Sequence, residues 1–358
     1  MRKNLLQLNT ANFEREFTQK TALYITDKFT ARRFSGADID EGVLIITKNE
    51  KVFFTDRRYV EEAKAQLVGS EITVETLKEK SQIIKHVKQS GVKTLYVDFS
   101  SLKAEEYFWL KNAGFKVGDA KDYIKETRRK KDAQTLFNIK RACEITQTAY
   151  EKTIEKLKTG VTELEIKRIL ENAFYDNGAD GIAFETIVAF GKNSAVPHHK
   201  TCDDKLKKGQ VVLIDCGCTY KGCCSDLTRT VYFGKADKTF KQRYQAVLTA
   251  NQKVIAEVKV GDGTKTAYEK AVNVLKENGV SEFFTHALGH GLGYEIHESP
   301  SLSPKSEQTL IDGEIFTVEP GVYFEGEYGI RIEDTVMLTE KGIIRLFTDG
   351  KELIEINK

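Results

Sequence analysis

The sequence has no long apolar run, almost no imbalance of charge and little proline. No segment approaches the roughly 20 apolar residues that a membrane-spanning helix needs, so we expect no part of the chain to lie in a membrane. The 55 basic and 53 acidic residues leave a formal net charge of +2, which gives no reason to expect nucleic acid as a partner. A basic run at 128–131 has no aromatic residues among it, and it indicates a solvated linker or a helical turn.

The sequence also lacks the paired CxxC motifs of a thiolate zinc site. Four of its six cysteines lie within 216–224, but their expected strand and turn positions alternate in direction, which makes convergence on one metal ion difficult. We interpret them as reduced residues of the core and of a site's surroundings. We expect Cys143 on a helix and Cys202 on a loop.

The beginning of the sequence is unlike a secretory signal. The first 20 residues carry Glu14 and Glu16 and contain no long apolar segment. We therefore expect a cytoplasmic protein.

The length of 358 residues predicts two domains. Residues 1–125 alternate short apolar runs with helical patterns, which is typical of a small α/β domain. Its single histidine, His86, falls in no site-like pattern. A charged stretch, 116–131, is expected to link this domain to a second one at 126–358.

The second part contains an internal duplication. A helix between Gly160 and Gly178 begins with a capping box, Thr162-x-x-Glu165. A second helix lies between Gly261 and Gly279, which are also eighteen positions apart. Each of these units is preceded by a long helix and followed by a strand that ends in an acid. We therefore expect two similar halves that face each other and place acids from both halves at a shared centre.

The acid of the first half lies in a predicted hairpin. The apolar run 211–214 precedes Asp215, and Asp226 precedes a second strand at 227–233. Two carboxylates brought together in this way both stay ionised only if a cation lies between them. Taken alone, this stretch fits equally well a structure in which Asp226 caps a turn and Asp215 pairs with an arginine such as Arg229.

The same pattern recurs in the second half and favours the metal. The apolar run 315–318 ends in Glu319, and the strand region 329–338 carries Glu333. Four carboxylates at strand positions, together with histidines, form a suitable ligand set for two metal ions. Five of the six histidines and all four prolines follow residue 196. These histidines are His198, His199, His286, His290 and His297.

Several segments carry a resemblance to a known family. They are ADGIAFETIVAFGKNSAVPHH (179–199), VVLIDCG (211–217), SDLTRTVYFG (225–234), GHGLGYEIHESP (289–300), FTVEPGVYF (316–324), GIRIEDTVML (329–338) and, in the first domain, FFTDRRYVEEA (53–63). In these segments the chain resembles the pita-bread metallopeptidases, specifically the branch of Xaa-Pro aminopeptidases and prolidases. The resemblance implies an α+β fold, in which a pseudo-twofold duplicated pita-bread catalytic domain follows a smaller, creatinase-like α/β domain.

The resemblance also implies a ligand set for two divalent metal ions. The five ligands would be Asp215, Asp226, His290, Glu319 and Glu333. Asp226 and Glu333 would bridge the ions, Asp215 would complete one of them, and His290 and Glu319 the other. Such an oxygen-rich shell suits Mn²⁺, with Co²⁺, Fe²⁺ or Zn²⁺ as alternatives. The family's nucleophile is a metal-bridging hydroxide, and Glu319 would also accept a proton.

Further residues match positions around the family's metals. His198 and His297 match outer histidines that orient the scissile amide and transfer protons, and His286 matches a histidine at the edge of the site. Arg331 lies two residues before Glu333 and is expected to reach the site as a supporting cation. His199 receives no role.

The implied activity is release of the N-terminal residue from peptides with proline in second position. An Xaa-Pro dipeptidase (prolidase) is the alternative, and nothing in the sequence shows what closes the substrate pocket. A non-catalytic binding protein of this fold is disfavoured because all five ligand positions are filled. The first domain and the HESP segment (297–300) disfavour a methionine aminopeptidase. We expect proline-containing peptides as substrates and a homodimer.

Overall fold

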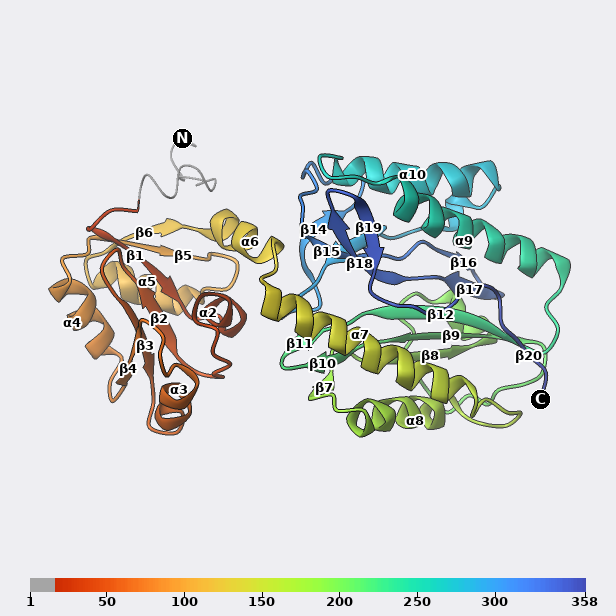
Figure 1. Ribbon diagram of the computed structural model, residues 1–358, viewed down its shortest axis with the longest axis horizontal. Helices are drawn as coiled ribbons and strands as arrows, with labels where there is room; N and C mark the ends of the chain where they lie inside the picture. Colours follow the sequence, from red (N-terminus) through yellow and green to blue (C-terminus); the bar gives the residue numbers. More distant parts are fainter. Residues whose placement is uncertain (1–16) are drawn as a thin grey trace. The chain divides into compact units, whose positions relative to one another are not determined.

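The computed structural model describes residues 17–358, which form two compact units. The first unit ends at Arg128 and the second runs from Arg129 to Lys358 (Figure 1). Across this part of the chain, no helix combines the length and apolar character that crossing a bilayer would require.

The first unit is built on one six-stranded sheet with the strand order β4-β3-β2-β1-β5-β6. The pairs β1–β2 and β2–β3 are antiparallel, and the other neighbours are parallel. Its strands are β1 (Thr21–Ile25), β2 (Val43–Ile46), β3 (Lys51–Thr55), β4 (Ile72–Thr76), β5 (Thr94–Val97) and β6 (Lys116–Asp119). Its helices are α2 (Lys28–Ser35), α3 (Val60–Gln66), α4 (Ser81–Gln89), α5 (Ala104–Asn112) and α6 (Lys121–Arg129).

Both faces of this sheet are buried. In β1, Leu23 and Ile25 belong to one apolar cluster, while Ala22 and Tyr24 belong to another. Because successive strand residues point to opposite faces, the two clusters lie on opposite sides of the sheet. This explains why the strands read as continuous apolar runs rather than as alternating patterns.

The expected linker at 116–131 is wrong. Its first part is β6, which pairs in parallel with β5 at the edge of the sheet, and its second part is α6. The basic run is not solvated as a whole, since Arg129 is 6% exposed and its Nε donates to Glu314 Oε1 at 2.5 Å. Lys131 is also buried, and its Nζ lies 2.7 Å from Glu298 Oε2. Partner carboxylates far along the chain allow these charges to be buried.

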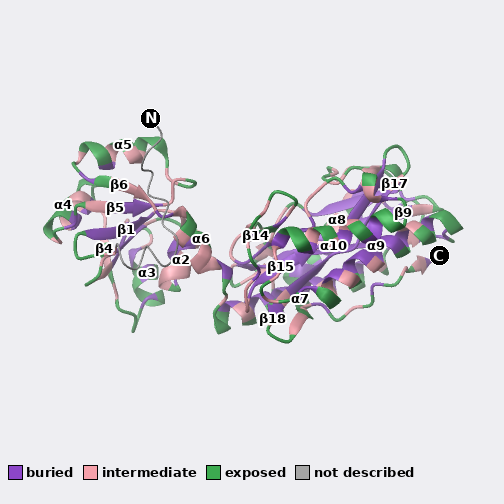
Figure 2. Ribbon diagram, turned by 90° about the horizontal axis from the view of Figure 1, so that it is seen from above, coloured by how far each residue is buried: buried purple, intermediate pink, exposed green. Residues whose placement is uncertain are grey.

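The second unit contains two larger sheets, each packed against two helices (Figures 1 and 2). The first sheet has the order β20-β12-β9-β8, and it shares an apolar cluster with α7 and α8. The second has the order β14-β13-β15-β18-β19, and it shares a cluster with α9 and α10. Figure 2 shows buried strands inside and helices whose exposed residues face outward.

The bounds of these elements are as follows. The helices are α7 (Ala133–Ile154), α8 (Glu163–Asp176), α9 (Lys238–Glu257) and α10 (Thr264–Glu277), with short 3-10 helices η1 (Gly191–Ala195) and η2 (Ser281–Phe283). The first sheet contains β8 (Ile187–Phe190), β9 (Gln210–Cys216), β12 (Leu227–Phe233) and β20 (Glu355–Ile356). The second contains β13 (Gly289–Gly291), β14 (Glu298–Leu302), β15 (Ile315–Val318), β18 (Asp334–Thr339) and β19 (Gly342–Arg345). Two small sheets contain β7 (Gly181–Ile182), β10 (Cys218–Tyr220) and β11 (Cys223–Cys224), and β16 (Gly321–Phe324) and β17 (Tyr328–Arg331).

The two halves of this unit repeat one another in detail. α8 and α10 each contain 14 residues, and the predicted capping box of Thr162 is present at the start of α8. Gly160 N–H donates to the carbonyl of Leu206, and Gly261 N–H donates in the same way to Leu310. Both loops also form an isolated bridge at the helix start, Thr162 with 205 and Gly263 with 309. The predicted duplication therefore extends to individual backbone hydrogen bonds.

Candidate metal centre

The acids of the first half meet across the hairpin of β9 and β12. The register pairs Asp215 with Thr228, two residues after Asp226. The connection runs through β10 and β11 and turns at Lys221 and Gly222, which both have positive φ angles (44° and 62°). This two-residue turn, whose residues both need left-handed conformations, is what a tight hairpin requires.

His290 reaches the centre from β13 because glycines flank it. A Cβ atom on Gly289 would lie 1.9 Å from the carbonyl oxygen of Thr317, and one on Gly291 would lie 2.1 Å from that of Ser299. Only glycine permits this approach to the neighbouring strands. The N–H of His290 then donates to Thr317 Oγ1 at 3.1 Å, and the Thr317 hydroxyl donates to Glu319 Oε1 at 3.1 Å.

The ligand candidates converge from both halves. Single ligand atoms of Asp226, His290 and Glu333 all lie within 4.8 Å of one another. His290 Nε2 lies 3.6 Å from Asp226 Oδ2 and 3.5 Å from Glu319 Oε1. The N–H of Glu333 donates to the carbonyl of Thr228, so a backbone hydrogen bond from a strand of the first half positions this ligand candidate of the second half.

The protonation of the carboxylates shows that the centre is built for positive charge. Burial, and then the charges of the neighbouring acids, raise the pKa values of Asp226 and Glu333 well above their usual range. Burial raises the pKa of Glu319 to about 8. Burial thus disfavours the charged forms of these acids, and a divalent ion would favour them again.

Within the described part of the chain, one carboxylate oxygen of Asp215 has no hydrogen-bond partner. Asp215 Oδ1 is buried, and among residues 17–358 it has no hydrogen-bond partner. A buried carboxylate oxygen without a partner is costly, and coordination to a metal would remove that cost. The residues present therefore fit a divalent metal site with oxygen and nitrogen ligands.

The ring of His290, a ligand candidate, is held in its neutral form. Its Nδ1 lies 3.1 Å from the carbonyl of Gly291, and a carbonyl only accepts, so we assign the ring proton to Nδ1. The lone pair of Nε2 then faces the carboxylates. Burial and the neighbouring His297 lower the pKa of His290 to about 4, which keeps the ring neutral at pH 7.

Arg331 contacts one ligand candidate directly and a second one through Thr228. Its Nη2 donates to Asp215 Oδ2 at 2.6 Å, and its Nε donates to Thr228 Oγ1 at 3.0 Å. The Thr228 hydroxyl donates in turn to Glu333 Oε2 at 2.6 Å. The remaining Nη1 donates to the Tyr323 hydroxyl at 2.6 Å. The expected approach of Arg331 to the site is thus present in the structure.

Asp215 does pair with an arginine, as the alternative from the sequence expected, but the partner is Arg331 and not Arg229. Arg229 is buried and binds Asp334 at 2.9 Å and Asp349 at 2.6 Å. Side chains alternate along β12, and the arginine lies on the face away from the metal centre.

The outer histidines lie around this group. His286 Nε2 accepts from the Tyr323 hydroxyl at 3.0 Å, and burial and the charge of Arg331 lower the pKa of His286 to about 4. The ring of His297 lies 4.3 Å from that of His290. Burial and the nearby charge of His198 lower the pKa of His297. Both His198 and His297 are exposed, which leaves them accessible to a substrate.

The cysteines near the centre are buried thiols. Cys216, Cys218, Cys223 and Cys224 are at most 3% exposed, and all six cysteines of the chain are free. Burial raises the pKa of Cys216 well above its usual value, so this residue remains an inert thiol of the core.

Sequence reasoning missed a buried amide behind the ligands. Asn251 on α9 is fully buried, and its Nδ2 donates to the carbonyls of Val318 at 2.8 Å and Ile332 at 3.3 Å. These are the residues directly before Glu319 and Glu333. The Oδ1 of Asn251 accepts from Lys351, whose Nζ also binds Asp334 at 2.8 Å. A single side chain thus joins the backbones that carry two ligands from one half.

We expect Asn251→Leu to lower metal affinity about 10–100-fold, as loss of supporting contacts around metal ligands typically does. The two carbonyls would lose their donor, so unfolding of the metal-free protein should also become easier by about 1–3 kcal/mol. Calorimetric metal titration and urea unfolding measure the two effects. Thr153→Val is the matched control, because the buried Thr153 hydroxyl donates to a helix carbonyl remote from the ligand strands. Equal metal affinities for the two variants would contradict the role of Asn251.

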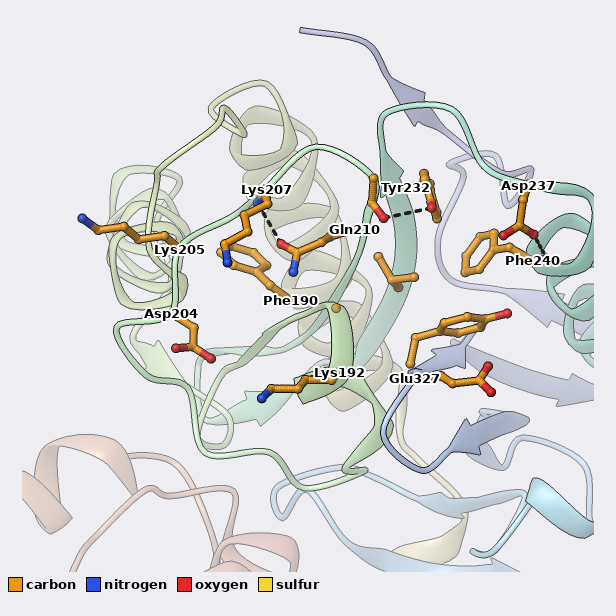
Figure 3. A pocket seen from close by; sticks show the side chains of 14 residues that line it. Phe190, Lys192, Asp204, Lys205, Lys207, Gln210, Tyr232, Asp237, Phe240 and Glu327 are labelled. Atoms are coloured by element: carbon orange, nitrogen blue, oxygen red, sulfur yellow. Dashed lines mark hydrogen bonds between the residues drawn. The ribbon is translucent and has the colours of Figure 1, made fainter.

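A pocket elsewhere in the second unit is separate from this centre (Figure 3). Its lining includes Phe190, Asp204, Gln210 and Tyr232, but none of the five ligand candidates and none of the outer histidines. This pocket is therefore distinct from the metal centre.

Comparison with known proteins defines the class. The model of metallopeptidase family M24 matches residues 138–340, and that of the creatinase/prolidase N-terminal domain matches residues 18–130. The chain belongs to metallopeptidase family M24, with the pita-bread fold and the creatinase-like first domain that its sequence predicts.

Relatives with Xaa-Pro names cover nearly the whole chain. It is 35% identical to an Xaa-Pro dipeptidase of Pyrococcus horikoshii, over 87% of the chain and 88% of that protein. It is 32% identical to the uncharacterized peptidase YqhT of Bacillus subtilis, over 93% and 95%. The solved X-Pro aminopeptidase of Thermotoga maritima MSB8 superposes with a TM-score of 0.89 at 32% identity, over 96% of this chain and all of that one.

Proposed function

We propose that this metallopeptidase is a two-metal exopeptidase that cleaves the bond between an N-terminal residue and a following proline. The convergence of Asp226, Glu333, Glu319 and the neutral His290 on one small space carries the proposal. In it Asp226 and Glu333 would be shared by the two ions, Asp215 would help to hold one ion, and His290 and Glu319 would help to hold the other. The oxygen-rich donor set favours Mn²⁺ over softer ions.

The bound cations would activate a water molecule and polarise the scissile carbonyl. The chain itself holds and moves protons around that reaction. Glu319 would accept a proton as a carboxylate, the form that bound cations favour. Arg331 and Thr228 fix the directions of Asp215 and Glu333.

We assign protonation of the leaving nitrogen to the two exposed histidines, His198 and His297. A bond to proline has no N–H, so the leaving nitrogen needs a proton donor and space for the ring. His198 lies close enough to His297 for its charge to lower the pKa of His297. A pair of adjacent histidines can orient the substrate amide and pass a proton to that nitrogen.

The hydrogen bonds of Arg331 favour an aminopeptidase over a dipeptidase. A dipeptidase needs a positive group for the free carboxylate of its substrate. In this chain the Nε, Nη1 and Nη2 atoms of Arg331 already donate to Thr228, Tyr323 and Asp215. Arg331 is therefore committed to supporting the ligands. The Xaa-Pro dipeptidase is the second candidate, favoured by relatives that carry that name.

One paired assay tests the substrate. We expect an Xaa-Pro-Xaa tripeptide to be cleaved at least as fast as an Xaa-Pro dipeptide in the presence of Mn²⁺, and both to resist cleavage in the presence of a chelator. Product release followed by chromatography measures the rates. A strict preference for the dipeptide would establish the prolidase instead. Equal cleavage of an Xaa-Ala peptide would contradict specificity for proline while leaving the metal centre intact.

We also propose a cytoplasmic location and a homodimer. The free thiols of all six cysteines support a reducing compartment. Sedimentation of the purified chain tests the dimer.

A further inference from the structure

A second group of metal-ligand side chains lies at the start of α8. Glu163 is fully buried, and its Oε2 lies 2.8 Å from His199 Nε2 and 3.3 Å from Cys202 Sγ. These three atoms all lie within 4.8 Å of one another. None of these residues belongs to the proposed catalytic centre, and the sequence alone assigned no role to His199 or Cys202.

The Glu163 carboxylate is fixed by other donors. Its Oε1 accepts from the N–H of Phe190 at 2.7 Å and from Asn193 Nδ2 at 2.9 Å, and its Oε2 accepts from the N–H of Cys202 at 3.0 Å. Asn193 also donates to Asp204, which lines the neighbouring pocket with Phe190 (Figure 3). These other donors would keep Glu163 Oε2 in place when a cation replaced the protons that His199 and Cys202 donate to it.

The repeat in the second half shows that the fold does not require these residue types. The backbone bond from Glu163 N–H to Asp204 corresponds to the bond from Thr264 N–H to Gln308. At this position Thr264 Oγ1 donates to Ser306 Oγ at 2.8 Å. The carboxylate and thiol of the first half therefore correspond to two hydroxyls, which hold the same loop to the same helix start.

We propose that Glu163, His199 and Cys202 form an additional cation site that selects Zn²⁺, or an ion of similar softness, over Mn²⁺. Carboxylate, imidazole and thiolate are the ligand types of three-ligand zinc sites, and water takes the fourth position. Zinc bonds of about 2.0–2.3 Å in a tetrahedral arrangement place ligand atoms roughly 3.3–3.7 Å apart. The present separations of 2.8 and 3.3 Å need to widen by only about half an ångström.

The exchange of protons at this site is defined. The carboxylate only accepts, so the His199 ring donates from Nε2 in the metal-free state. On metal binding that proton transfers to Nδ1 through solvent, and the Cys202 thiol loses its proton to solvent. One proton is released for each cation bound. Burial raises the pKa of the Cys202 thiol, so apparent metal affinity should rise with pH.

The position of the site gives it a link to the peptidase reaction. His198 directly precedes His199, so a cation bound here would tie the backbone of His198 to the start of α8. The side chain of His199 is 13% exposed, and Cys202 is half-buried, which leaves the ligands within reach of solvent.

Titration of the metal-free, full-length protein with Co²⁺ tests the proposal. We expect a thiolate-to-cobalt charge-transfer band whose final intensity corresponds to one thiolate-bound ion per chain, beyond any Co²⁺ taken up by the catalytic centre, and which disappears when Zn²⁺ is added. The band should be absent in Cys202→Ser and strongly reduced in His199→Gln. The five remaining cysteines of Cys202→Ser serve as an internal control. Asp226→Asn, which disrupts the proposed catalytic centre, should keep the band, so failure of one proposal can be told from failure of the other.

Two results would overturn the site. One is cobalt binding by the wild-type protein without a thiolate band. The other is a band that persists in Cys202→Ser, because another cysteine would then be the ligand. Melting curves of the metal-free variants show whether each variant is folded. If Cys202→Ser does not fold, the intensity of the cobalt band in His199→Gln tests the site instead.

Discussion

Glu333→Gln and Asp226→Asn should each lower metal content and peptidase activity together. Both residues are almost fully buried between the two halves, and both are proposed to bridge the ions. Metal-ion stabilisation of charge in a transition state is worth several kcal/mol, and 1.36 kcal/mol corresponds to a tenfold change in rate, so we expect losses of about a thousand-fold or more. Elemental analysis and kcat/KM measured on the same preparation check the two effects.

The metal-free forms of these variants provide the control for folding. In the wild-type protein without a cation, burial and the neighbouring acids raise the pKa values of Asp226 and Glu333 and so disfavour their charged forms. Neutral amides of the same shape should therefore leave the melting temperature of the metal-free protein unchanged or higher. The increase in melting temperature on adding Mn²⁺ should be lost. Two bound ions and near-normal turnover in either variant would show that the ligand assignment is wrong.

His198→Ala and His297→Ala should keep their metal but lose rate. Neither histidine belongs to the proposed ligand set, and both are exposed beside it. Proton transfer and orientation by a positioned side chain are commonly worth 10²–10⁴-fold, so we expect kcat/KM to fall by about that factor. Steady-state kinetics with an Xaa-Pro-Xaa peptide, together with metal analysis, separates this outcome from loss of the ions.

His86→Ala is the matched control for the histidine variants. His86 lies on α4 in the first unit, where its Nε2 contacts Glu50 at 3.1 Å, and this variant should keep its kcat/KM. Unchanged kcat/KM in both His198→Ala and His297→Ala would exclude the pair from the reaction.

The sequence was most informative where chemistry restricts the choice of residue. An acid at the end of a buried strand needs a partner, and this principle marked Asp215 and Glu319 as candidates. The equal spacing of glycines predicted the duplication, because a helix between two left-handed glycines has a fixed length. Gly160 and Gly178, and their counterparts in the second half, all have positive φ angles.

What the sequence did not reveal depends on contacts between distant residues. Asn251 lies in an ordinary helical pattern, and only the fold shows that it contacts the carbonyls before two ligands. Glu163 reads as a first-turn helix acid, although it is fully buried. The residues of α6 read as a linker because the helix is strongly charged, and its one fully buried apolar residue, Ile124, is too weak a signal. Partners of buried charges cannot be recognised before the chain is folded.

The origin of the ligands has a consequence for the ancestry of the protein. Asp215 and Asp226 come from the first half, and Glu319 and Glu333 come from the second, in backbones that share individual hydrogen bonds. One half by itself supplies only part of a coordination shell. An ancestral chain of half this length would have completed a metal centre only as a symmetric pair of copies. After fusion of the two copies, each half could have changed independently. The group of Glu163, His199 and Cys202 is one such difference, because hydroxyl side chains occupy the matching place in the other half.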